Sequence, residues 1–149
     1  MPITQRILGA ALGRLPKLIS PAQHALIDYA VAATFLAAGA ALWKRHRRAG
    51  ISAFLCGSAA AVNGIITDYP GGLFPVIDFE THGQVDASLA GIAVALPRLM
   101  GFSSDRQSRF FDLQATLATA TSALTDYGQE RAGRTGIKLP QLSRMRRAA

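Results

Sequence analysis

The sequence predicts an all-α protein, a polytopic membrane four-helix bundle built from two parallel repeats of one helical hairpin. Three observations predict it. Half of the 149 residues are hydrophobic while the formal net charge is +7, so apolar and basic residues must occupy different parts of the chain. Apolar runs of about the length of a membrane span alternate with charged segments. A set of polar residues also recurs after 58 residues, which indicates a duplication.

The N-terminal arm, residues 1–20, is expected to form an amphipathic helix that lies in the membrane interface. Arg6, Arg14 and Lys17 alternate there with leucines and isoleucines. The uncharged run between the two arginines is too short to cross a membrane and has no small-residue cleavage site. We therefore expect no secretory signal.

The transmembrane domain is expected over residues 21–127. Its first span, 21–43, begins at Ser20 and Pro21, a side-chain N-cap followed by a proline in the first turn. The basic run 44–48 ends this span. Further spans are expected at 51–67, 82–100 and 110–125, and the last of these is polar enough to need bundle neighbours.

The basic residues border the apolar spans, and this placement favours anionic lipid headgroups over nucleic acid as the partner. The tail, 128–149, is expected to be flexible or to bind such lipids. The basic loop at 44–48 favours a cytoplasmic position for that loop, whereas the basic tail favours the reverse orientation, so both stay open. Cys56 is the single cysteine and is expected to be a packing residue.

Two motifs carry the repeat. His24-x-x-x-Asp28 recurs as His82-x-x-x-Asp86, and the Thr-Asp-Tyr at 67–69 recurs at 125–127, both with an offset of 58 residues. Repeat one therefore covers 24–69 and repeat two 82–127, and both have the same orientation because each contains two spans. An antiparallel hairpin brings the start of its first helix beside the end of its second. We expect one membrane face to gather the polar residues His24, Asp28, Asp68, Tyr69, His82, Asp86, Asp126 and Tyr127.

These motifs resemble the SPW-repeat family of small bacterial integral membrane proteins, in which a His-x-x-x-Asp opens one helix and a Thr-Asp-Tyr closes the next. The resemblance covers residues 20–127 and is best over 67–102. The chain departs from the family's Ser-Pro-Trp motif, with Leu-Pro-Arg at 96–98 and Ala-Gly-Ala at 38–40. The resemblance implies a four-span protein of the bacterial inner membrane and implies no particular biochemical activity.

Two kinds of function fit the polar cluster. In the first, its groups only hydrogen-bond one another, with Tyr69 and Tyr127 as structural members, and the protein is a structural or accessory subunit that packs against other membrane subunits. In the second, the cluster binds a transition metal such as Zn, Fe or Mn. The candidate ligands are His24, Asp28, Asp68, His82, Asp86 and Asp126.

Two variants of these hypotheses remain open. Bis-histidine haem through His24 and His82 is a narrower form of the metal hypothesis. A proton or ion relay is the other, although Asn63 and Asp112 are the only polar candidates deeper in the spans. The sequence shows no Ser-His-Asp spacing, phosphate-binding glycine loop or cysteine cluster, so we expect no catalytic residues and no enzyme activity.

Overall fold

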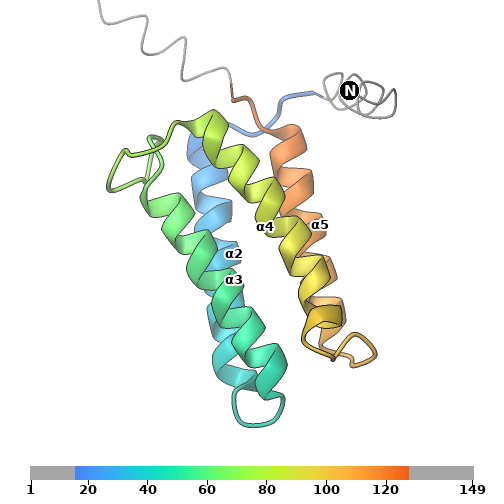
Figure 1. Cartoon of the computed structure of the whole chain (residues 1–149). Coiled ribbons are helices and arrows are strands. Elements are labelled where there is room, and N and C mark those ends of the chain that lie inside the picture. The colour runs from blue at the N-terminus through green and yellow to red at the C-terminus, as the bar shows by residue number, and fades with distance from the viewer. Residues whose placement is uncertain (1–15, 128–149) are drawn as a thin grey trace, which may run out of the picture.

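The computed structural model describes residues 16–127. Within that range the chain is all-α, with four helices and no strand (Figure 1). The helices are α2 (Pro21–Leu42), α3 (Arg47–Ile65), α4 (Phe79–Leu99) and α5 (Ser108–Leu124). The predicted all-α class and the number of helices are confirmed. The predicted arm, apart from residues 16–20, and the predicted tail lie outside the described residues.

The helices that open the two repeats begin with similar caps. At the start of α2 the Ser20 hydroxyl accepts a hydrogen bond from the backbone N–H of Gln23, whose side chain accepts one in return from the N–H of Ser20. At the start of α4 the carboxylate of Asp78 accepts from the N–H of Thr81 at 2.7 Å. The helix α4 thus begins at Phe79 and not at His82, because Asp78 supplies the cap that the prediction overlooked.

The helices form two antiparallel pairs, α2 with α3 and α4 with α5, and α3 also contacts α4 while α2 contacts α5 (Figure 1). Small residues bring the first pair close together. A Cβ atom added at Gly57 of α3 would lie 2.9 Å from Cγ of Leu36 and 3.0 Å from the carbonyl oxygen of Ala32. Only glycine allows this approach, so Gly57 sets the spacing of α2 and α3.

The apolar core fills the half of the bundle near the loops that follow α2 and α4. The ring of Phe111 on α5 lies at its centre, with ring centroids 5.7 Å from Phe35 and 5.5 Å from Phe102. The other half has a smaller apolar cluster of Ala25, Tyr69 and Phe79. The histidines and aspartates of the two His-x-x-x-Asp motifs lie in this second half. The larger apolar core therefore lies to one side of them.

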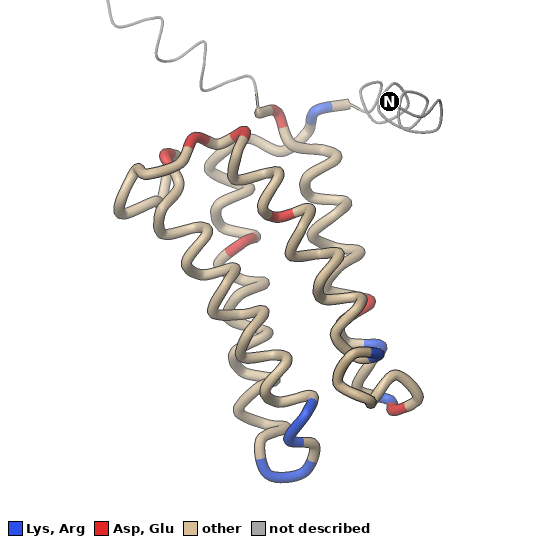
Figure 2. Tube along the Cα trace, in the orientation of Figure 1, with Lys and Arg blue, Asp and Glu red and all other residues tan. Residues whose placement is uncertain are grey.

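Charged residues are unevenly distributed along the bundle, although Lys17 lies just before α2 and Asp105 lies in the loop after α4 (Figure 2). Lysines and arginines occupy the loops after α2 and α4, and carboxylates predominate at the end where α2 and α4 begin. Among the described helices, α2 is the one that is long and apolar enough to count as a candidate membrane span, and 22 % of its apolar stretch is buried. The other three predicted spans form helices but do not reach that standard.

Candidate metal centre

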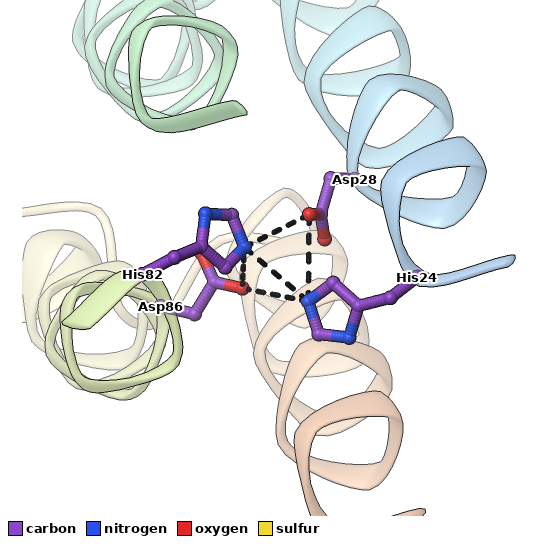
Figure 3. A group of neighbouring side chains, drawn as sticks. All are labelled: His24, Asp28, His82 and Asp86. Carbon is purple, nitrogen blue, oxygen red and sulfur yellow. Dashed lines mark hydrogen bonds and ion pairs between the residues drawn. The ribbon is translucent and has the colours of Figure 1, made fainter. Parts of the chain in front are cut away.

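Four side chains from two helices meet at the end of the bundle where α2 and α4 begin (Figure 3). Nε2 of His82 lies 3.0 Å from Oδ2 of Asp28 and 3.0 Å from Oδ2 of Asp86. Nε2 of His24 lies 3.4 Å and 3.3 Å from the same two oxygens. The two Nε2 atoms are 3.3 Å apart. These four residues each offer an atom that lies within 4.8 Å of the other three.

Helix periodicity accounts for half of this arrangement. Residues four apart in an α-helix share a face, so Asp28 lies one turn after His24 on α2, and Asp86 lies one turn after His82 on α4. Both helices begin at the same end of the bundle, and their four side chains point toward one another (Figure 3). The two i, i+4 pairs therefore form one cluster and not two separate sites.

A threonine hydroxyl determines which ring nitrogen of His82 carries the hydrogen. Thr67 lies two residues after the end of α3. Its hydroxyl donates its single hydrogen to the carbonyl oxygen of Asn63 at 2.5 Å. The same oxygen lies 2.8 Å from Nδ1 of His82, and because its hydrogen is already used, it can only accept there. Nδ1 of His82 therefore carries a hydrogen. In a neutral imidazole the lone pair is then on Nε2, which points into the cluster.

The second repeat makes the same arrangement around His24. The hydroxyl of Thr125 donates to the carbonyl oxygen of Thr121 at 2.7 Å and accepts from Nδ1 of His24 at 2.7 Å. Each histidine is thus held by the threonine of the other repeat. Both imidazoles present Nε2 to the cluster for the same physical reason.

Matching backbone bridges hold these threonines in place. Thr125 forms an isolated parallel bridge with Ile19, just before α2, and Thr67 forms one with Ile77, just before α4. In the hydrogen bonds of these bridges the N–H of Asp68 donates to the carbonyl oxygen of Ile77 at 2.9 Å. The end of one hairpin is therefore tied to the beginning of the other, which positions each threonine beside its histidine.

The two carboxylates are held by different neighbours. The side-chain amide of Asn63 donates to Oδ1 of Asp86 at 2.9 Å, and the phenol of Tyr69 donates to Oδ2 of Asp28 at 3.3 Å. Tyr127 occupies the place of Tyr69 in the second repeat but donates to the Ser122 hydroxyl at 3.1 Å. The repeats are therefore alike in how they hold the histidines and unlike in how they hold the aspartates.

Aromatic rings cover the imidazole side of the cluster. The ring centroid of His24 lies 5.2 Å from that of Phe79 and 5.7 Å from that of Tyr127, and His82 lies 5.1 Å from Tyr69. Both histidine side chains are at most 1 % exposed, whereas the carboxylates of the cluster are 13 % exposed. Burial among these rings raises the pKa of Tyr127 to about 12 and also raises the pKa of Tyr69.

The structure brings together four of the six predicted ligands. Asp68 and Asp126 lie outside the four-residue cluster, although both are at the predicted end of the bundle. The helices α3 and α5 end before these residues, and the N–H of Asp126 donates to the carbonyl oxygen of Ile19 at 3.1 Å. The preceding threonines, and not the aspartates, therefore face the histidines.

Sequence reasoning missed the roles of Thr67, Thr125 and Asn63. The two threonines belong to the repeated Thr-Asp-Tyr motif, so the repeat did contain the signal. An aspartate attracts attention as a metal ligand, while a threonine that orients a histidine has no ligand chemistry of its own. Asn63 has no counterpart of the same type in repeat two, where Thr121 stands in its place.

Comparison with known proteins identifies no relative. No protein-family model matches the sequence, and neither a curated protein nor a solved structure matches the chain. The resemblance to SPW-repeat proteins therefore rests on the sequence motifs alone. Fold and site together define a four-helix protein with a buried cluster of two histidines and two aspartates.

Proposed function

We propose that this protein is a membrane-embedded four-helix bundle that binds one transition-metal ion through His24, Asp28, His82 and Asp86. The distances among the ligand atoms carry the proposal. In a tetrahedral site with metal–ligand bonds of about 2.0–2.2 Å, neighbouring ligand atoms lie about 3.3–3.6 Å apart. The five of these distances that involve a histidine Nε2 atom run from 3.0 to 3.4 Å, close to this spacing, and all four ligand atoms lie within 4.8 Å of one another.

The charges of the four groups also call for a cation at the centre. Two carboxylates and two Nε2 lone pairs converge in a site from which solvent is largely excluded, and such groups repel one another. Protons can relieve this repulsion, but a proton lies on the line between one donor and one acceptor. A metal ion lies at a similar distance from all four atoms. The near-equal spacing of His24 and His82 from both oxygens favours the metal.

Imidazole and carboxylate ligands suit Zn²⁺ best, with Fe²⁺ and Mn²⁺ as alternatives. The threonine hydroxyls act as the outer partners that metal-binding histidines require. The haem variant does not fit. Axial nitrogens of one haem iron would lie about 4 Å apart with the porphyrin between them, whereas the Nε2 atoms of His24 and His82 are 3.3 Å apart and the two carboxylates lie beside them.

Exposed apolar side chains support a membrane location, and the proposal of a bacterial inner membrane follows from the resemblance to SPW-repeat proteins. Each helix presents such residues to the outside, and they include Leu26 at 72 %, Leu55 at 58 %, Ile92 at 50 % and Leu117 at 47 % exposure. Water would leave these faces unfavourably hydrated, whereas lipid tails cover them. An accessory subunit would use the same faces to pack against other spans. That role does not require the buried cluster of His24, Asp28, His82 and Asp86, whereas metal binding accounts for it. Metal binding is therefore the better supported function.

Metal analysis of the protein purified in mild detergent tests the metal site. We expect an equimolar transition metal in the wild type and its loss in a His24→Ala, His82→Ala double variant. His46→Ala is the matched control, because His46 is exposed in the loop before α3. Circular dichroism of each variant checks whether it keeps its helices. A double variant with the metal content of the wild type would contradict the proposal.

Extraction of membranes with alkaline carbonate tests the location. This treatment releases proteins that are bound only at the membrane surface, while bundles that span the bilayer stay in the pellet. We expect the chain to remain in the pellet. Its release into the wash would rule out a membrane-spanning bundle, even if metal binding persisted.

A further inference from the structure

A narrow cavity of about 40 Å³ lies between the four helices beside the metal cluster. Asp28 and Asp86 line it, whereas His24 and His82 do not. The carboxylate side of the cluster therefore borders the cavity, while aromatic rings close the imidazole side. Any small molecule that reaches the cluster from within the bundle approaches it from the carboxylates.

Gln114 of α5 lines the same cavity and is 7 % exposed. Its amide nitrogen donates to the hydroxyl of Thr34 at 3.0 Å. That hydroxyl donates its only hydrogen to the carbonyl oxygen of Val31 at 2.8 Å, so it can only accept from Gln114. The amide therefore cannot be turned around, and its Oε1 atom points away from Thr34.

Oε1 of Gln114 is buried, and residues 16–127 provide it with no hydrogen-bond donor. A buried acceptor without a partner is unfavourable, and native proteins usually satisfy such groups with ordered water. The other walls are mostly apolar, with Val31, Phe35, Leu89, Ala90 and Ala115 among them. Hydrogen-bond acceptors thus occur at the carboxylates and at Gln114, with apolar surface between them.

The volume limits what can enter. A single water needs about 10–15 Å³ of such space, so a cavity of about 40 Å³ has room for more than one water but not for an organic ligand. Water also provides two hydrogens, which match acceptors at two places. Its size and its chemistry both fit the cavity.

We propose that this cavity is a water site, and that its water bonds to Gln114, Asp28 and Asp86 and provides an exchangeable ligand to the bound metal. The last part rests on the proposed metal function. A metal with four protein ligands and adjacent water can expand to five-coordination. The centre then differs from a closed structural site, since one ligand can leave and be replaced.

Nuclear magnetic resonance of the metal-free protein in detergent tests the water itself. We expect nuclear Overhauser contacts between water and the methyl groups of Ala90 and Ala115. These contacts should weaken in Gln114→Met, which keeps the side-chain length but removes one of the acceptors that hold the water, while Asp28 and Asp86 remain. Gln84→Met is the matched control, since Gln84 is exposed on α4. Absence of the contacts in the wild type would overturn the water site, and that measurement needs no variant.

Absorption spectra with Co²⁺ as the probe test the role of the water at the metal. Four-coordinate Co²⁺ absorbs visible light more strongly than five-coordinate Co²⁺. We therefore expect the visible bands of the wild type to be weaker than those of Gln114→Met. Equal spectra in the two proteins would overturn the ligand role. Failure of the wild type to bind Co²⁺ would instead contradict the metal site, so the two failures are distinguishable.

Discussion

The Nε2 atoms of His24 and His82 lie 3.3 Å apart, although the two residues are separated by 58 positions and belong to different hairpins. Each imidazole is oriented by a threonine of the opposite hairpin, Thr125 for His24 and Thr67 for His82. Neither hairpin therefore holds a complete site. The cluster exists only when both repeats are folded against each other.

Removing the hydroxyl of Thr67 or Thr125 should weaken metal binding. Thr67→Val and Thr125→Val keep the side-chain shape but leave Nδ1 of one histidine without its partner, and loss of such a partner typically costs about 10–100-fold in affinity. Competition with a chelator of known affinity measures the change. Thr119→Val is the control, because Thr119 makes the same kind of bond to its own helix and contacts no histidine. Equal affinities in all three variants would contradict the orienting role.

Neutralising an aspartate should have opposite outcomes inside and outside the cluster. Asp28→Asn and Asp86→Asn remove a negative ligand and should greatly reduce metal content. Asp68→Asn and Asp126→Asn should retain it, since these residues lie outside the four-residue group. Metal analysis of the four purified variants gives the comparison. Retention of metal in Asp86→Asn, together with its loss in Asp126→Asn, would invert the assignment of ligands.

Alanine at Gly57 should destabilise the first hairpin. Its Cβ would lie 2.9 Å from Leu36 and 3.0 Å from the backbone of Ala32, and overpacking of this kind costs about 1–3 kcal/mol. Gly91→Ala is the matched control, because a Cβ there meets nothing within 4 Å. It should be neutral or more stable by about 0.5–1 kcal/mol. Thermal unfolding in detergent measures both, and equal midpoints would argue against close packing at Gly57.

The phenol of Tyr127 should resist ionisation until strongly alkaline pH. Burial raises its pKa from 10.0 to about 12, so between these two values the unfolded chain loses a proton that the folded chain keeps. Stability from this group is complete below pH 10 and declines as the pH rises toward 12. Ultraviolet titration of phenolate should show a phase near pH 12 that Tyr127→Phe removes. A titration that ends before that phase would contradict the burial of Tyr127.

The sequence alone determined the helices and the end of the bundle at which the polar residues gather. Helix formation depends on local signals, and Ser20, Pro21 and the apolar run after them were enough to locate the start of α2. The i, i+4 spacing of His24 and Asp28 was enough to put them on one face. Because hairpins bring helix ends together, the repeated motifs also predicted a shared end.

Tertiary structure alone decided which polar groups meet. Spacing along one helix fixes a face, but the distance between His24 and His82 depends on how α2 and α4 are rotated and shifted relative to each other. The bridges at Thr67 and Thr125 join the two hairpins and so contribute to that placement. The two Thr-Asp-Tyr motifs lie beyond the last helical turns of α3 and α5, where helix periodicity no longer predicts the direction of a side chain. For that reason the threonine of each Thr-Asp-Tyr motif, and not its aspartate, faces the histidine of the other repeat.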